Sequence, residues 1–326
     1  MHAIRQREFG PPETLIYEEV ADPVPADGQV RIAVEAAGVH LLDTTIRRGE
    51  SGGPFPLPDL PMTPGREVAG RVEALGPGVD DHWRGRRVVA HLGMASGGYA
   101  ELAVAPVGAL HELPTDLDAD AAVTMIGTGR TTMGILEVAQ PTPDDVVLVT
   151  AAAGGIGSLL VQAVHNVGAV VAGVAGGPDK VERARKLGAD VGVDYREPGW
   201  PDAVREALEG RIVTLALDGV GGEIGRGVLE LLAPGGRIVM FGWSSGTPLE
   251  LSTADLYAGG ITASAAVGPR IMRRPGGMRD LESRALAEAA AGRLVPSVTR
   301  FPLADAARAH AALEGRNTVG KTVLLP

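Results

Sequence analysis

The chain has 326 residues, a formal net charge of −10 and no cysteine. This length is typical of two domains, the acidic balance argues against a nucleic-acid partner, and the absence of cysteine excludes disulfides and thiolate metal sites. No apolar run reaches the roughly 18 residues of a membrane helix, and Met1 to Gly10 lacks the apolar core of a signal peptide, so we expect a cytoplasmic protein with no membrane partner.

The first part of the chain, to about residue 120, predicts a β-rich lobe. Proline and glycine turns such as Pro23-Val24-Pro25 and Asp27-Gly28 separate the expected strands. These strands are short apolar or alternating runs at 15–20, 30–34, 68–75, 87–90 and 99–104. Strands with this punctuation are typical of a compact, partly closed antiparallel structure.

From Ala119 the pattern changes to alternating strands and helices. The expected strands are 146–150, 170–174, 191–193, 213–217, 237–241 and 261–267, and the expected helices between them are 157–167, 179–187, 202–208 and 223–232. Alternation of this kind predicts an α/β fold with a doubly wound parallel sheet.

The last part of the chain is expected to return to the β-rich lobe. It contains an expected helix at 280–291, a strand near 297–299, a helix at 303–314 and a strand at 322–325. The predicted domains are therefore a discontinuous β-rich domain, residues 1–121 and 275–326, and a nucleotide-binding domain, residues 122–274.

A glycine-rich turn stands at the centre of the predicted parallel sheet. Val146 to Thr150 is a short β-branched run, three glycines follow at 154, 155 and 157, and apolar residues then recur at helical spacing. Strand, glycine turn and helix are the context of a dinucleotide fingerprint, in which a pyrophosphate lies at the positive helix N-terminus. The pattern is incomplete, because Ala152 stands where the first glycine is expected.

The choice of nucleotide follows from the end of the second strand. Enzymes that use NAD place an acidic residue there to bind the ribose hydroxyls. Here the segment reads Val174-Ala175-Gly176-Gly177, without a carboxylate, and Lys180 follows. A cation at this place favours the 2′-phosphate of NADP(H). Asp179 could instead turn inward and oppose a phosphate.

Motifs along nearly the whole chain resemble those of the zinc-free quinone oxidoreductases of the medium-chain dehydrogenase/reductase superfamily. The resemblance implies a GroES-like β-rich catalytic lobe, a Rossmann domain, NADP(H), a small-molecule substrate and a homodimer joined through the edge of the Rossmann sheet at 261–267. It rests on Gly38-Val39-His40-Leu41-Leu42-Asp43, Pro64-Gly65-Arg66-Glu67-Val68-Ala69-Gly70, Ala151 to Gly157, Lys186-Leu187-Gly188-Ala189-Asp190, Asp218-x-Val220-Gly221-Gly222, Phe241-Gly242-x-Ser244-Ser245-Gly246 and Gly320-Lys321-x-Val323-Leu324.

The resemblance also assigns expected site residues. Thr131 and Phe241 match positions at the nicotinamide side, and Tyr195 and Arg316 join Lys180 at positions that contact the 2′-phosphate. The expected cofactor-binding residues are Thr131, Ala153, Gly154, Gly155, Ile156, Gly157, Gly176, Lys180, Tyr195, Phe241 and Arg316.

The expected catalytic residues are His40, Asp43 and Thr45. His40 replaces the family asparagine beside the nicotinamide, and Thr45 stands where a tyrosine often contacts substrate. Histidine titrates near neutral pH and suits proton donation. Asp43 would support the charge of the ring if both side chains faced the substrate.

No metal is predicted. Zinc-containing relatives have cysteine at the position of His40 and histidine at that of Arg66, and arginine is a permanent cation. His40 and Glu67 alone fall short of the three protein ligands of a catalytic zinc. Glu67 is then expected to be a structural acceptor.

The sequence therefore predicts an enzyme that transfers hydride from NADPH to a quinone or an α,β-unsaturated carbonyl compound. Three alternatives stay open. They are an enoyl-thioester reductase, a biosynthetic enzyme with an altered pocket such as a cyclase, and a nucleotide-binding protein in which His40 and Thr45 mark a lost active site.

Overall fold

The computed structural model describes residues 1–50 and 56–326, which form two compact units. The β lobe comprises residues 1–127 and 296–326, and the parallel-sheet unit comprises residues 128–295. The sequence-based boundaries at 121 and 275 differ from these. The larger difference arises because α10 (Gly277–Ala290) packs on α3 (Arg130–Ala139) and so belongs to the parallel-sheet unit.

The β lobe is built on one large sheet with the strand order β14-β15-β3-β4-β5-β7, and β6 also pairs with β3. The sheet is antiparallel except for the parallel pair β14 and β15. Its strands are β3 (Gln29–Val39), β4 (Glu67–Leu75), β5 (Arg87–His91), β6 (Leu102–Pro106), β7 (Leu110–Glu112), β14 (Val298–Pro302) and β15 (Lys321–Leu325). A separate antiparallel pair consists of β1 (His2–Gln6) and β2 (Leu15–Glu19).

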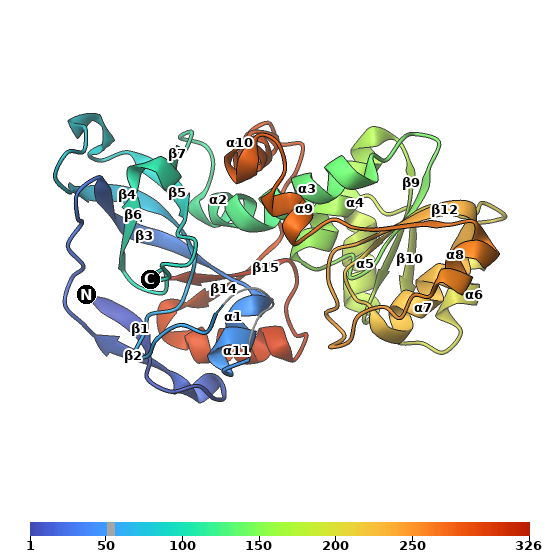
Figure 1. The fold of residues 1–326 in the computed structure, drawn as a ribbon, viewed down its shortest axis with the longest axis horizontal. Helices are drawn as coiled ribbons and strands as arrows, with labels where there is room; N and C mark the ends of the chain where they lie inside the picture. Colours follow the sequence, from blue (N-terminus) through green and yellow to red (C-terminus); the bar gives the residue numbers. More distant parts are fainter. Residues whose placement is uncertain (51–55) are drawn as a thin grey trace. The chain divides into compact units, whose positions relative to one another are not determined.

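Buried and more exposed residues alternate along β3, so that one face of this strand packs on the core of the β lobe. Val30, Ile32 and Val34 are buried, and the residues between them are more exposed, as expected for a strand with one face on a core. Residues from both ends of the chain meet in this core, including Ile4, Leu15, Leu303 and Leu324. The lobe also contains the helices α1 (Leu41–Arg47), α2 (Ala119–Thr124) and α11 (Ala306–Glu314) (Figure 1).

The parallel-sheet unit has six parallel strands in the order β10-β9-β8-β11-β12-β13. Numbered along the chain, this is the order 3-2-1-4-5-6 of a Rossmann fold. The strands are β8 (Val146–Val149), β9 (Val170–Ala175), β10 (Val191–Asp194), β11 (Val213–Asp218), β12 (Leu232–Met240) and β13 (Thr262–Ala265). The expected α/β fold, a doubly wound parallel sheet plus a discontinuous β-rich lobe, is confirmed.

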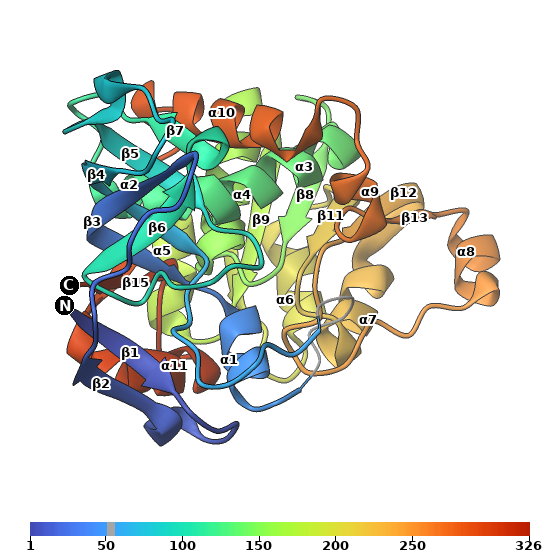
Figure 2. The same ribbon diagram turned by 60° about the vertical axis from the view of Figure 1, so that its left-hand side comes forward.

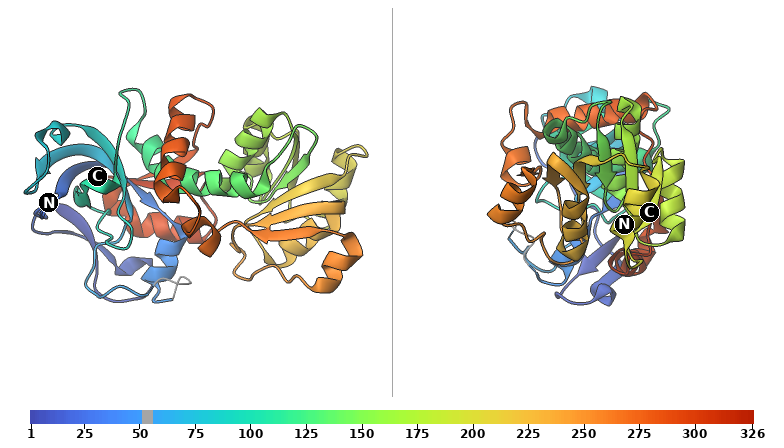
Figure 3. Two further views of the ribbon diagram at one scale, coloured as in Figure 1. Left: turned by 45° about the horizontal axis from the view of Figure 1, so that its top comes forward. Right: turned by 90° about the vertical axis from the view of Figure 1, so that its right-hand side faces the viewer.

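Helices cover both faces of the parallel sheet (Figures 2 and 3). The strand β8 shows why: Val147 and Val149 belong to one core cluster, whereas Val146 and Leu148 belong to another on the opposite face. A strand buried on both faces needs the unbroken apolar run that this sequence has.

The helices of this unit agree with the expected ones near the glycine turn and differ near β13. The segment between the expected strands 237–241 and 261–267, for which the sequence predicts no helix, contains α8 (Thr253–Gly259), which has no buried residue. The remaining helices are α4 (Gly155–Val167), α5 (Pro178–Lys186), α6 (Trp200–Ala207), α7 (Gly222–Leu231) and α9 (Pro269–Met272). Among the described residues, no helix is both long enough and apolar enough to cross a membrane.

Candidate active site

The glycine turn forms the entry to α4, as the sequence predicts. β8 ends at Val149, Ala151 adopts a positive φ of 48°, and the backbone N–H of Gly154 donates to the carbonyl of Ala151 at 2.8 Å. A β-carbon at Gly157 would overlap that carbonyl, so only glycine fits there. The first N–H groups of α4 have no carbonyl of the preceding turn to bind, and such groups attract anions.

Ala152, which replaces the first glycine of the fingerprint, is accommodated by the neighbouring strand. It is fully buried, and its N–H donates to the carbonyl of Val174 in β9 at 3.1 Å. A β-carbon at Gly173 would lie 3.2 Å from the methyl group of Ala152. Because Gly173 has no side chain, the methyl group of Ala152 fits at the position where the fingerprint has a glycine.

Asp218 stabilises the point where the strand order reverses, between β8 and β11. Its buried carboxylate accepts from the hydroxyl of Thr150 at 2.8 Å and from the backbone N–H groups of Val220 and Gly221 at 3.0 and 3.1 Å. The hydroxyl of Thr150 in turn accepts from the N–H of Gly219 at 2.9 Å. These bonds hold the loops at the carboxyl ends of the strands, where ligands of this fold bind.

Phe241 and Thr131 are both half-buried in the parallel-sheet unit. The N–H of Phe241 donates to the carbonyl of Asp218 at 2.8 Å, and its ring covers Gly219, at which a β-carbon would overlap the ring. Thr131 lies in the first turn of α3. Phe241 thus packs on the loop at the strand-order reversal, and its expected nicotinamide contact stays a prediction.

A charged pair from the end of β10, which sequence reasoning missed, lies beside the turn that follows β9. Asp194, the last residue of β10, receives the side chain of Arg196 through Nε at 3.2 Å and Nη2 at 3.0 Å, and the backbone N–H of Arg196 at 3.0 Å. The guanidinium covers Gly177, where a β-carbon would lie 2.6 Å from Nη2. A cation therefore lies beside the turn at which NAD enzymes place a carboxylate.

Burial raises the pKa of Asp194, but the bonds from Arg196 and from the N–H of Gly177 outweigh it and lower that pKa below its ordinary value. The pair is therefore ionised at neutral pH. Tyr195 is half-buried, and a β-carbon at Gly176 would lie 3.2 Å from its ring. Lys180 lies half-buried in the first turn of α5, next to the exposed Asp179. Arg316 is exposed on the β lobe and has a positive φ of 58°.

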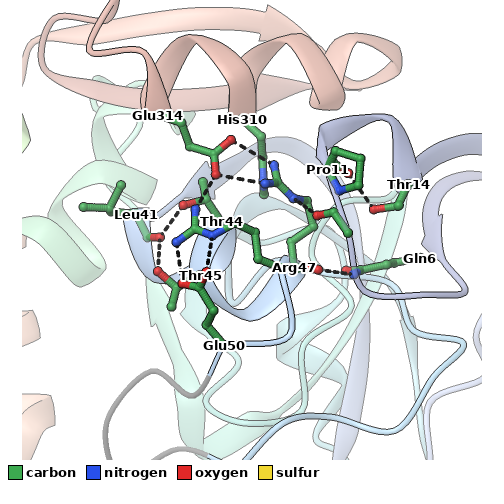
Figure 4. Close-up of polar contacts among 12 residues, drawn as sticks. Gln6, Pro11, Thr14, Leu41, Thr44, Thr45, Arg47, Glu50, His310 and Glu314 are labelled. Atoms are coloured by element: carbon green, nitrogen blue, oxygen red, sulfur yellow. Dashed lines mark hydrogen bonds and ion pairs between the residues drawn. The ribbon is translucent and has the colours of Figure 1, made fainter. Parts of the chain in front are cut away.

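In the β lobe, His40 stands immediately before α1, which is anchored at both ends. At the start, the backbone N–H of His40 donates to Oδ2 of Asp43 at 2.8 Å. At the end, the buried side chain of Arg47 donates to Glu314 of α11 at 2.9 and 3.2 Å (Figure 4). The rigid helix fixes the backbone of His40.

Asp43 is oriented differently from the expectation. Besides the N–H of His40, its buried carboxylate accepts from the hydroxyl of Tyr99 at 3.1 Å and lies 3.5 Å from Nε of Arg66. Asp43 is the third residue of α1, where a carboxylate that accepts from the preceding backbone N–H caps a helix. The carboxylate thus supports the backbone of His40 rather than its ring.

A buried histidine completes this polar chain. The hydroxyl of Tyr99 lies 3.2 Å from Nε2 of His310 on α11. Burial lowers the pKa of His310 to about 4, so the ring is neutral at pH 7. Burial also raises the pKa of Tyr99 well above its ordinary value, and the nearby carboxylate of Asp43 adds to this effect.

Thr45 lies on the second turn of α1 and is half-buried. Its hydroxyl donates to the carbonyl of Leu41 at 3.3 Å, within the same helix (Figure 4). Hydroxyls on helices often bond the carbonyl four residues earlier. Nothing in these contacts gives Thr45 the reach of the tyrosine that often stands at its position.

The most unusual feature of the β lobe is a cluster of Glu67, His40 and Lys321. Nε2 of His40 lies 2.6 Å from Oε1 of Glu67 and 2.8 Å from Nζ of Lys321. Nζ of Lys321 also donates to Oε2 of Glu67 at 3.0 Å. One ring nitrogen is therefore within bonding distance of both a carboxylate and an ammonium. It can donate to the first when protonated and accept from the second when bare.

Burial differs sharply across the cluster. The side chain of Glu67 is 0% exposed, that of Lys321 4% and that of His40 28%. Burial alone would raise the pKa of Glu67, but the neighbouring His40 and Lys321 outweigh it and hold that pKa well below its ordinary value. Glu67 is therefore a buried carboxylate with its counter-charge in contact, and His40 is the member that reaches the surface.

The cluster does not fit a metal ion. Among residues 1–50 and 56–326, no three histidine, aspartate, glutamate or cysteine side chains converge as metal ligands do. His40 and Glu67 are two candidate ligands, and the ammonium of Lys321 already lies against both. A zinc ion needs at least three protein ligands and the space that this ammonium fills.

Two known protein families match the two parts of the chain. Residues 26–115 match the alcohol dehydrogenase GroES-like domain, and residues 155–283 match the model described as zinc-binding dehydrogenase. The chain is 35% identical to a 2-haloacrylate reductase from Burkholderia sp, over 97% of this chain and 96% of the relative. It is 32% identical to a quinone oxidoreductase from Pseudomonas aeruginosa, over 98% and 97%.

The chain belongs to the quinone oxidoreductase family of the medium-chain dehydrogenase/reductase superfamily. Solved members of this family share its fold along the whole chain. The Escherichia coli quinone oxidoreductase complexed with NADPH superimposes with a TM-score of 0.86 at 28% identity, with 100% of both chains covered. A mycobacterial protein complexed with NADPH gives 0.86 at 34% identity, also with 100% of both covered.

Proposed function

We propose that this chain is an NADPH-dependent, metal-independent reductase that delivers hydride to a quinone or an α,β-unsaturated carbonyl compound. The observation that carries the proposal is the glycine turn of Ala151 to Gly157 at the strand-order reversal, together with cations in place of a carboxylate after β9. Relatives named quinone oxidoreductase and 2-haloacrylate reductase, and neighbours solved with NADPH, support it.

In this proposal the parallel-sheet unit binds the cofactor. The N-terminal N–H groups of α4 bind the pyrophosphate, with Ala153, Gly154, Gly155, Ile156 and Gly157 supplying the backbone. Lys180 and Tyr195 bind the 2′-phosphate, and we add Arg196 because its guanidinium covers Gly177. Charge-assisted bonds to a phosphate are strong, so these cations favour NADPH over NADH.

The β lobe supplies the group that acts on the substrate. Hydride reaches the carbon far from the carbonyl, the carbonyl oxygen becomes an enolate, and a proton completes the reduction. Two observations support a role for His40 in this step: its side chain is 28% exposed, and its backbone N–H is bound by Asp43. We propose that His40 stabilises or protonates the developing oxyanion. The cofactor supplies the hydride chemistry.

The substrate class is tested by incubating the purified chain with NADPH and a panel of quinones, enones, 2-haloacrylate and enoyl thioesters. Loss of nicotinamide absorbance should occur with quinones or with compounds that have an alkene conjugated to a carbonyl. A preference for enoyl thioesters would replace the proposed substrate class. Tight NADPH binding without oxidation by any compound would favour a nucleotide-binding protein without turnover.

We also propose a homodimer that forms through the edge of the parallel sheet. β13 is the last strand in the order of that sheet, and the adjacent helix α8 carries Tyr257, which is 89% exposed. An unpaired strand edge pairs readily with a second copy. Sedimentation at micromolar concentration should show a dimer, and lysine at Thr262 and at Ala265 should convert it to a monomer. A monomeric wild-type chain would refute this assembly.

A further inference from the structure

The Glu67–His40–Lys321 cluster contains more charge than the proposed proton step requires. His40 alone could meet a substrate oxygen, yet a fully buried carboxylate and a nearly buried ammonium lie behind it. Burying two charges costs several kcal/mol of desolvation for each ion. The buried pair of Glu67 and Lys321 lies next to His40, the residue proposed to act on the substrate. We therefore asked what function the pair could have there.

The position of the ammonium suggests that role. Nζ of Lys321 lies 2.8 Å from Nε2 of His40 and 3.0 Å from Oε2 of Glu67, so a nitrogen and an oxygen lone pair converge on one cation. Imidazole nitrogen and carboxylate oxygen are also the donors that bind zinc. The two donors here are bound to a side chain instead of an ion.

We propose that the ammonium of Lys321 takes the place that a metal ion would need in order to bind both His40 and Glu67, so that the protein carries a cation there as a side chain. The inference rests on the proposed metal-independent function of the same site. Lys321 would act through His40, as a positioning residue that fixes the ring and keeps a positive charge behind it. The same ammonium would repel any divalent ion from His40 and Glu67.

The local fold supports a built site. Lys321 begins β15, whose next residue, Thr322, pairs with Val39, so the strand register brings Lys321 beside His40. Gly38 packs against Oε2 of Glu67 and Gly127 against Oε1, and a β-carbon at either glycine would overlap the carboxylate. Glu67 is thus confined on both sides, and the cation has a fixed partner.

The test is to replace the ammonium by a metal ligand and ask whether a metal enters. Lys321→His adds an imidazole, which is shorter than lysine, so an ion can fill the difference and complete three protein ligands with His40 and Glu67. Chelator-treated full-length protein is titrated with Co²⁺. The expected result is a visible absorption band of tetrahedral Co²⁺ at one equivalent for Lys321→His, and no such band for the wild type or for Lys321→Arg.

Two further variants make the result specific. Lys321→Cys offers a thiolate in place of the imidazole and should also bind Co²⁺. The double variant His40→Asn with Lys321→His removes one ligand and should lose the band. The proposal is overturned if the wild type binds one equivalent of Co²⁺ in a His40-dependent way. It is also overturned if Lys321→His and Lys321→Cys, both folded by circular dichroism, bind none.

A kinetic comparison separates this inference from the proposed function. With an accepted substrate, Lys321→Arg, which keeps the charge, should retain more turnover than Lys321→Met, and both should bind NADPH with wild-type affinity. Equal turnover of the two variants would contradict a role for the positive charge. If the wild type reduces no compound of the panel, the proposed function fails, and the Co²⁺ titration still decides the place of Lys321.

Discussion

Gly127 lies so close to Glu67 that a β-carbon on the glycine would overlap the carboxylate oxygen Oε1. The carboxylate of Glu67 cannot move away easily. Gly38 packs against its other oxygen, Oε2, and the carboxylate is also in contact with Lys321 and His40. The position of the whole cluster therefore depends on a residue that has no side chain.

We predict that Gly127→Ala will destabilise the β lobe and lower turnover together. Extra volume in a packed site typically costs about 1–3 kcal/mol, and here the volume falls on a buried ion pair. Denaturant unfolding measures the free energy, and NADPH oxidation measures turnover. Gly108→Ala is the matched control, since a β-carbon at Gly108 meets nothing within 4 Å. Equal stability of the two variants would contradict the packing described.

His310 should make the stability of the β lobe depend on acid. Its pKa is lowered by burial to about 4, below the ordinary 6.5, so the unfolded chain takes up a proton in this interval that the folded chain does not. The free energy of unfolding should therefore fall as pH falls from 6.5 to 4, by up to about 1.4 kcal/mol per pH unit from this group. Denaturant unfolding between pH 4 and 7 measures it. His310→Gln should show a shallower loss, whereas the exposed His82→Gln should follow the wild type.

Cofactor preference should depend on the cations near the end of β9. Lys180→Ala and Arg196→Ala are each expected to weaken NADPH binding by about 1.5–3 kcal/mol, the scale of a hydrogen bond to a charged group, and to leave NADH nearly unchanged. Titration calorimetry with both cofactors measures this. Lys186, an exposed lysine on the same helix as Lys180, is the control. If either variant weakens both cofactors equally, that residue supports the fold and not the 2′-phosphate.

His40→Asn restores the residue that the family usually has and tests the proposed proton donor. Turnover should fall by about 10²-fold, within the usual range for general acid catalysis. NADPH affinity should not change. If turnover is unchanged, His40 only lines the pocket and the proton comes from water.

The sequence predicted the parallel sheet and its glycine turn well, because the signals there are local. The apolar run of β8, the glycines and the helical spacing of α4 lie within about twenty residues, and β8 is indeed buried on both faces. Even the missing fingerprint glycine has a local explanation, in the contact between Ala152 and Gly173.

The cluster behind His40 could not be predicted in the same way. Lys321 is 281 residues from His40 and 254 from Glu67, and only the register of β15 on β3 brings them together. The sequence shows the motif Gly320-Lys321, but its distance along the chain from His40 and Glu67 gives no indication that Lys321 contacts them. Arg196 was missed for a similar reason: its place over Gly177 depends on the pairing of β10 with β9.

Asp43 shows how a correct motif can suggest the wrong orientation. Three residues after His40, its carboxylate could reach either the ring or the backbone, and the sequence does not distinguish them. The structure selects the backbone, because a carboxylate at the third helical position satisfies an N–H that α1 leaves unbonded.

Because β15 lies between β14 and β3, the β lobe is closed by residues that are synthesised after the whole parallel-sheet unit. During translation the parallel-sheet unit can fold first. At that stage the edge of β3 that pairs with β15 is still unpaired, and Glu67 lacks its contact with Lys321. A chain that ends between residues 296 and 320 would contain the whole parallel-sheet unit but would lack the ammonium of the charged cluster. The cluster can therefore form only after Lys321 has been synthesised and β15 has paired with β3.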